Sequence, residues 1–169
     1  MTLATHTLVA GATARLLSIT NPVAALLVGL ASHYGIDAIP HYDYPLRSAR
    51  QERSEKLEFT LTPSKKNLLR DLLAVGVDSV LGVLLLVALT PKSLDGTHLI
   101  TTLALILGAI LPDALQAAFF VYQKSPLLET KLLHDFFHAK HRLTKDWLGI
   151  GSQALIVLLA VLVLARFHP

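Results

Sequence analysis

The sequence predicts an all-α fold: one integral membrane domain over residues 1–169, with about four to five membrane helices and a short helix on the cytoplasmic side. Three observations predict it. The chain is 53% hydrophobic and 16% charged, with a mean hydropathy of +0.54, whereas a soluble domain of this length carries more charge. Several apolar segments approach the roughly 20 residues that span a bilayer core about 30 Å thick. Loops rich in Lys and Arg alternate with a loop that has almost none.

Three segments are long enough to span that core. Leu68–Leu89 is rich in Leu and Val, and His98–Tyr122 is interrupted near its end by Leu111-Pro112-Asp113. Trp147–Phe167 has almost no polar side chains, and its aromatic ends are typical of the membrane interface. These segments therefore predict three membrane helices.

The first forty residues allow two interpretations. Thr7–Ile19 predicts a short helix, which ends at Asn21-Pro22, and Pro22–Ile39 predicts a second helix, which ends at Pro40. Either the second helix spans the membrane alone, or the two form a hairpin that enters and returns. The apolar N-terminus is not preceded by basic residues and is interrupted by Arg15, so no cleavable signal peptide is expected.

The loops orient the chain. Six Lys and Arg residues lie between positions 41 and 67 and five between 123 and 146, but only Lys92 lies between 90 and 97. Because Lys and Arg favour the cytoplasmic side, both basic loops are expected in the cytoplasm and the C-terminus outside. Membrane lipid is the expected partner, and the net charge of +3 needs no nucleic acid to explain it. Arg47 to Glu58 mix both signs and predict a solvated loop or an exposed helix.

A first group of polar side chains closes the second N-terminal segment. His33 and Asp37 are four residues apart, so they share one face of a helix, and His41 and Asp43 follow within six residues. An imidazole and a carboxylate at this spacing can chelate a divalent cation. They can equally form a hydrogen-bonded pair that closes a helix end, and both interpretations stay open.

A second group contains three histidines in helical register. His134, His138 and His141 follow the i, i+4, i+7 pattern of one helix face, which favours metal ligands over a solvated surface helix with incidental histidines. Phe136 and Phe137 lie on other faces, where they could rest on the membrane or the core.

A third group consists of acids inside apolar segments. An ionised group at membrane depth costs at least about 2.5–3.5 kcal/mol, so it normally faces a partner or a wet cavity. Asp71 is expected at the interface, paired with Arg70 or a nearby Lys. Asp78 and Asp113 lie deeper and therefore predict partners.

The predicted direction of each helix brings these groups to one membrane face. His33 to Asp43 lie at a cytoplasmic helix end, and His134 to His141 lie in a cytoplasmic loop. A hairpin would return His6 to the same face, whereas His98 and His168 fall on the opposite face. The predicted metal ligands are His6, His33, Asp37, His41, Asp78, Asp113, His134, His138 and His141. The predicted catalytic carboxylates, which act as general base where they do not bind metal, are Asp37, Asp43 and Asp113.

Absent motifs narrow the chemistry further. The chain has no cysteine, so neither a disulfide nor a thiolate metal site can form. It also lacks G-x-S-x-G, H-E-x-x-H, a P-loop and G-x-G-x-x-G. A site built from nitrogen and oxygen ligands to a divalent metal remains.

The order of these motifs resembles a family of small bacterial membrane-bound metal-dependent hydrolases, which is distantly similar to the all-helical zinc-dependent phospholipase C fold. The matching features, which cover most of the chain, are Thr5-His6 with Gly11 following, His33-x-x-x-Asp37, Pro40-His41-x-Asp43, Leu111-Pro112-Asp113 and His134-x-x-x-His138. The resemblance implies one or more zinc ions held by His6, His33, Asp37, Asp113, His134 and His138. It also implies a phosphoester or lipid-like substrate and a bacterial inner membrane.

Two features depart from the soluble phospholipases. Those enzymes carry a Glu in their second helical pair, where this chain has His138, and they use the amino group of an N-terminal Trp, whereas this chain starts Met-Thr. A missing ligand would leave fewer metal ions or no catalysis.

Two classes of function compete. A metal-dependent hydrolase would act on a phosphoester at the cytoplasmic membrane face. The alternative is a non-catalytic metal-binding protein, or an ion or proton carrier that uses Asp78 and Asp113. Transport needs a polar path to the outer face, and the outer halves of the predicted helices are apolar, so the sequence favours the hydrolase.

Overall fold

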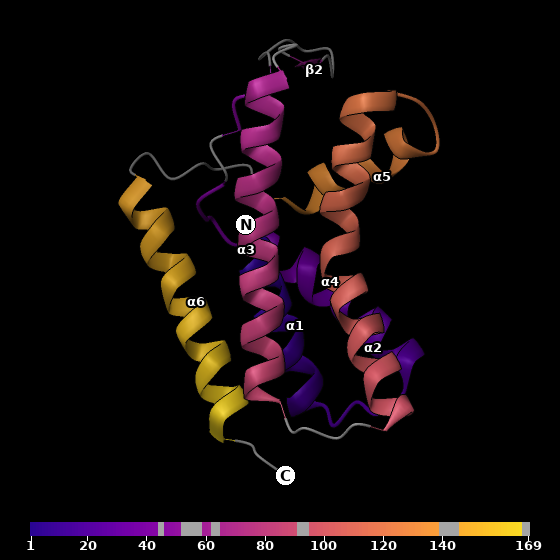
Figure 1. Ribbon diagram of the computed structural model, residues 1–169, viewed down its shortest axis with the longest axis vertical. Helices are drawn as coiled ribbons and strands as arrows, with labels where there is room; N and C mark the ends of the chain where they lie inside the picture. The colour runs from indigo at the N-terminus through magenta and orange to yellow at the C-terminus, as the bar shows by residue number, and fades with distance from the viewer. Residues whose placement is uncertain (44–45, 52–58, 62–64, 91–94, 139–145, 167–169) are drawn as a thin grey trace.

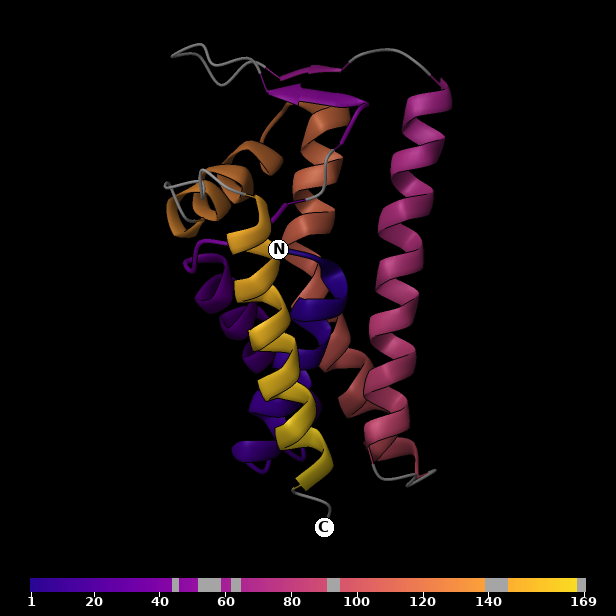
Figure 2. The same ribbon diagram turned by 90° about the vertical axis from the view of Figure 1, so that its left-hand side faces the viewer.

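The computed structural model describes residues 1–43, 46–51, 59–61, 65–90, 95–138 and 146–166. Six helices account for most of them, and the predicted all-α class is confirmed (Figures 1 and 2). The helices are α1 (Leu3–Leu16), α2 (Pro22–Asp37), α3 (Lys65–Leu89), α4 (Gly96–Tyr122), α5 (Leu127–Phe137) and α6 (Asp146–Arg166). The predicted short helix of the second basic loop is α5, an 11-residue helix.

Three of these helices are long and apolar enough to cross a membrane. They are Asn67–Leu89 in α3, Gly96–Tyr122 in α4 and Trp147–Arg166 in α6, which run roughly along the long axis of the molecule (Figure 1). Large apolar side chains such as Leu81, Leu107 and Leu158 are exposed on their outer surfaces. The prediction of four to five membrane helices is therefore too high, because the other helices are too short.

The two N-terminal helices form the predicted hairpin. Helix α1 has 14 residues and α2 has 16, which is short of the roughly 20 that a bilayer core requires. The Asn21 side chain caps α2 by accepting from the amide of Ala24 at 2.8 Å, and Pro22 occupies the first turn. The chain then turns back, so that the rings of His6 and His33 stack with centroids 3.9 Å apart. Helix α2 is not among the helices that are long enough to cross a membrane.

Helices α2 and α4 cross at a distance that only glycine permits. A Cβ on Gly29 would lie 2.5 Å from the carbonyl oxygen of Leu105, and one on Gly108 would lie 2.3 Å from the carbonyl oxygen of Leu26. Both obstacles are backbone atoms, which cannot rotate away. Close contact of this kind is how small residues pack helices in membranes. The crossing holds the last turn of α2 beside the Pro112 region of α4.

A small antiparallel hairpin lies at one end of the bundle, in the segment predicted as a loop or an exposed helix. Strand β1 (Ala49–Gln51) pairs with β2 (Phe59–Leu61), with Arg50 opposite Thr60. The Asp71 carboxylate of α3 accepts from the amides of Arg47 at 2.8 Å and Ser48 at 2.7 Å. Backbone amides thus hold Asp71, whereas the sequence predicted a pair with Arg70 or a Lys.

Candidate metal centre

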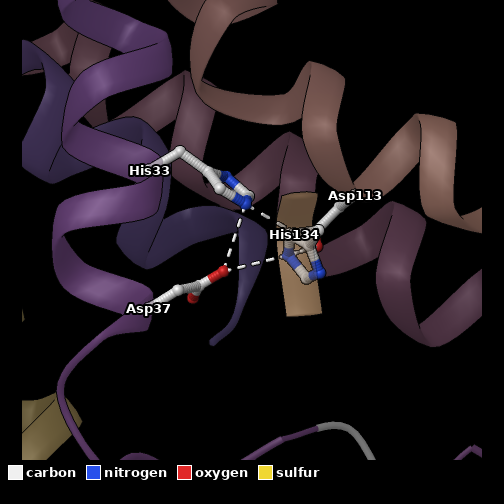
Figure 3. Close-up of side chains that lie close together, drawn as sticks. All are labelled: His33, Asp37, Asp113 and His134. Carbon is white, nitrogen blue, oxygen red and sulfur yellow. Dashed lines mark hydrogen bonds and ion pairs between the residues drawn. The ribbon is translucent and has the colours of Figure 1, made fainter. Parts of the chain in front are cut away.

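Three helices bring four predicted ligands to one point (Figure 3). His33 and Asp37 come from the last turns of α2, Asp113 from α4 and His134 from α5. Asp37 Oδ2 lies 3.2 Å from His33 Nε2 and 3.1 Å from His134 Nε2, and Asp113 Oδ1 lies 3.4 Å from His134 Nε2. One ligand atom from each of the four residues falls within 4.8 Å of the others, so this group could hold a metal ion.

A backbone carbonyl on the side away from the cluster fixes the orientation of the His33 ring. Its Nδ1 lies 2.8 Å from the carbonyl oxygen of Ala109, which can only accept, so Nδ1 carries the proton. The Nε2 atom is left as an unprotonated acceptor in the neutral ring and points into the cluster. Histidines that bind metals are commonly held through the other ring nitrogen in this way. The Gly29–Gly108 crossing makes this contact, because it brings the backbone of α4 within reach of α2.

A second group of possible metal ligands shares Asp37 with the first group, which consists of His33, Asp37, Asp113 and His134. Asp37, His41 and His138 also offer ligand atoms within 4.8 Å of one another. Asp43 Oδ1 lies 2.8 Å from His41 Nε2 and 3.7 Å from His138 Nε2, and the α-amino group of Met1 lies 2.7 Å from His41 Nε2. Asp37 therefore presents Oδ2 to the first group and Oδ1 to the second.

Helix α6 supports the second group. A Cβ on Gly149 would lie 2.9 Å from the amide nitrogen of Tyr42, and the Ser152 hydroxyl donates to the carbonyl oxygen of Pro40 at 3.1 Å. The His41 Nδ1 atom donates to the carbonyl oxygen of Ile39 at 2.6 Å, which directs Nε2 toward Asp43. The segment that follows α2 is thereby held against α6.

The cluster contains buried nitrogens without hydrogen-bond partners, which tests whether a cation fits. These atoms are His6 Nδ1, His6 Nε2, His33 Nε2 and His134 Nδ1. His6 Nε2 lies 3.3 Å from Asp37 Oδ1, close enough for contact but outside hydrogen-bonding geometry. An unsatisfied buried polar atom costs about 1–3 kcal/mol. A cation between the imidazoles and Asp37 would satisfy the Nε2 atoms, so the residues fit a metal ion.

The charges in the cluster also suit a cation. Burial alone would raise the pKa of the Asp37 carboxyl, but the hydrogen bond with the His134 imidazole lowers this pKa well below its usual range. Burial likewise opposes ionisation of Asp43, and His138 and His41 lower its pKa in the same way. Both carboxylates are therefore ionised at neutral pH.

The pKa values of two imidazoles are shifted in opposite directions. Burial lowers the pKa of His6 to about 4, more than Asp37 raises it, so this ring is neutral at neutral pH. Burial also lowers the pKa of His134, but Asp113 and Asp37 outweigh it and raise the pKa to about 9. Without metal, His134 is therefore a cation between two carboxylates.

Metal binding is expected to release the proton of His134. Its raised pKa keeps this proton bound below about pH 9, and a coordinating imidazole must be deprotonated, so metal and proton compete. Titration calorimetry with zinc at pH 8, in buffers of different ionisation enthalpy, should show about one proton released at the His134 group. Release should fall toward zero by pH 10. Release that stays the same at both pH values would contradict this assignment.

Most of the predicted site residues converge. The structure brings His6, His33, Asp37, His41, Asp43, Asp113, His134 and His138 to one cluster. It does not bring Asp78 there: the Asp78 carboxylate accepts from the amide of Ala4 at 2.9 Å, in the first turn of α1. That contact stabilises an otherwise unpaired helix amide, and Asp78 belongs to neither group of possible metal ligands in the described residues.

The second histidine motif is not one continuous helix face. Helix α5 ends at Phe137, and His138 has extended backbone angles, although its amide still donates to the carbonyl oxygen of His134 at 2.9 Å. His138 therefore reaches Asp43 from the helix end. His141 lies outside the described residues.

Two contributors to the site carry no clear sequence signal, and the burial of Lys131 beside His134 was not predicted. The Ala109 carbonyl is a backbone group, and the Met1 amino group belongs to no motif. Lys131 was assigned to the basic loop, but its side chain is only 1% exposed and pairs with Asp135. Its spacing of three residues from His134, which places both on one helix face, is the signal that could have found it.

The fold and the cluster define the class of protein. Three helices long and apolar enough to cross a membrane indicate a membrane protein, and its buried imidazoles and carboxylates could hold a metal ion. The chain matches no family model, no curated protein and no solved structure.

Proposed function

We propose that the protein is a membrane-bound metal-dependent hydrolase that acts on a phosphoester or lipid-like substrate at the cytoplasmic face of a bacterial inner membrane. The observation that supports it most is the sharing of Asp37 between two groups of ligand atoms. Two cations bridged by one carboxylate are a common arrangement for phosphoester hydrolysis. The resemblance of the motif order to the bacterial hydrolase family, which implies zinc, is the second support.

The carboxylates differ in exposure, which separates their proposed roles. Asp37 is 1% exposed and is surrounded by imidazoles, so it is a ligand. The side chains of Asp113 and Asp43 are 27% and 41% exposed, so both lie where the cluster meets solvent. Asp113 contacts His134 and acts as a ligand of the first group.

Asp43 is then the best-placed general base. It is ionised, it is the most exposed acid of the cluster, and it can accept a proton from water beside the substrate. A bound divalent cation supplies Lewis acidity toward the phosphoryl oxygen. His41 Nε2, which lies 2.8 Å from Asp43 Oδ1, orients the carboxylate.

The first test is metal content. Protein purified without chelator is expected to contain at least about one equivalent of zinc, and a His33→Ala, His134→Ala double variant should lose most of it, because both rings leave the first group. Elemental analysis measures the loss. His98→Ala, at the Gly96 end of α4 and far from the cluster, is the control and should keep its metal. Full metal retention in the double variant would refute the metal centre.

The second test separates catalysis from binding. Hydrolysis of a chromogenic phosphodiester should fall at least about a hundredfold after chelation and return with zinc, whereas Asp43→Asn should keep its metal but lose activity. Metal without any turnover would leave a non-catalytic metal-binding protein. A liposome ion flux that depends on Asp78 would favour the carrier.

A further inference from the structure

Helix α5 has two faces of opposite character. Lys131 and His134 are buried on one face, and His134 is a ligand of the first group. Leu132, Leu133, Phe136 and Phe137 are all exposed on the other face, and Phe136 is 71% exposed. Four large apolar side chains at this spacing form one continuous stripe along the helix. Phe137, 39% exposed, also contacts the ring of Tyr34 with centroids 5.1 Å apart, but the outer surface of the stripe is open among the described residues. Helix α5 is not one of the three candidate spans.

The cluster places α5 near one boundary of the hydrocarbon core. Asp113 lies 17 residues after Gly96, or about 26 Å along α4 at 1.5 Å per residue. A bilayer core is about 30 Å thick, so Asp113 lies close to the boundary opposite Gly96. His134 contacts Asp113 at 3.4 Å, which fixes α5 at the same depth.

The neighbouring helices support this depth. Helix α5 lies at the height at which α6 begins, in both views of the bundle (Figures 1 and 2). Trp147, in the first turn of α6, is 65% exposed, and tryptophan favours the membrane interface. Val121 and Tyr122 are also exposed at the end of α4 from which the chain enters α5. The stripe thus continues the apolar surface of the spans at this end.

We propose that the exposed stripe of α5 (Leu132, Leu133, Phe136 and Phe137) docks into the boundary between the headgroups and the acyl chains of the bilayer. One short helix then carries a metal ligand on one side and lipid contacts on the other. Glu129 pairs with Ser125 at the start of the helix, which keeps that end polar. This inference rests on the spans and on the stripe, not on catalysis.

The absence of cysteine from the chain makes a direct test practical, because a single introduced Cys is the only site that a thiol-reactive spin label can take. Phe136→Cys is labelled in vesicles of phosphatidylcholine and phosphatidylglycerol. Collisions with oxygen, which enriches in lipid, are compared with collisions with chromium oxalate, which stays in water. Labels at Leu81→Cys, on the outer surface of α3, and at Lys124→Cys, in the connection after α4, give the lipid and water references.

For the Phe136 label, the ratio of oxygen collisions to chromium oxalate collisions is expected to be at least about five times the ratio for the Lys124 label. It should approach the ratio for the Leu81 label. A label at Leu133→Cys, on the same stripe, should give a similar collision ratio. It replaces the Phe136 label if the Phe136 variant does not fold. A Lys124-like ratio at both positions would place the stripe in water and overturn the proposal. Shielding from both reagents would show a protein partner instead, such as a second copy, and would also overturn it.

Discussion

Replacing Asp37 with asparagine is expected to abolish metal binding at both groups, lowering the metal content to less than about a tenth of that of the unmodified protein. Asp37 is the residue that the two groups share, and its two oxygens face different imidazoles. Asparagine keeps the shape but removes the charge and one oxygen acceptor. Elemental analysis of the purified variant measures the result, with His33→Ala as the comparison, which removes a ligand of the first group alone.

The matched control is Asp78→Asn. Asp78 is a second acid on an apolar helix, but it contacts the amide of Ala4 and lies outside the cluster. This variant should keep its full metal content, and its amide oxygen can still accept from the Ala4 amide, so stability is expected to change by less than about 1 kcal/mol. Normal metal content in Asp37→Asn, or a comparable loss in Asp78→Asn, would mean that the cluster is not organised around Asp37.

Gly108→Leu is expected to cause the largest loss of stability among single substitutions in the helix crossings. Its Cβ would lie 2.3 Å from the carbonyl oxygen of Leu26, so α2 and α4 must separate. Overpacking of this kind costs about 1–3 kcal/mol, which lowers the thermal midpoint by about 2–12 °C in a chain of this size. Separation also removes Ala109 from His33, so metal affinity should fall with stability.

Gly76→Leu provides the comparison for this prediction. Gly76 also lies in a membrane helix, but a Cβ there would meet no atom within 4 Å. A leucine at this position faces open space and should leave the thermal midpoint and the metal content close to those of the unmodified protein. The two variants are compared by thermal unfolding in detergent and by elemental analysis. Equal midpoints would show that the α2–α4 crossing is not closely packed.

The convergence of the site could be predicted because it depends on membrane sidedness. Each crossing reverses the chain, so the apolar segments and the basic loops indicate which polar groups share a face. His33, Asp37 and His134, the last separated from Asp37 by 97 residues, were therefore predicted to meet, and the structure confirms it. His6 joined them as the hairpin interpretation required.

The differences between the prediction and the structure have a common cause, which is the rotation and packing of the helices. Asp78 lies at a suitable depth, but the way α3 packs on α1 aims it at Ala4, and no local pattern specifies that rotation. Helices α1 and α2 pair with each other, and neither is as long as the three candidate spans. His138 was placed within a helix that ends one residue earlier.

The helical class, the three long apolar segments and the set of imidazoles and carboxylates that gather at one end could be predicted from the sequence. Those properties depend on the length, hydropathy and charge of contiguous segments. The tertiary structure alone decided that Asp37 joins two ligand groups, and that glycines at 29 and 108 let the α4 backbone hold His33. Such contacts depend on distances of a few ångströms between segments far apart in the chain, which packing sets and spacing along the sequence does not encode.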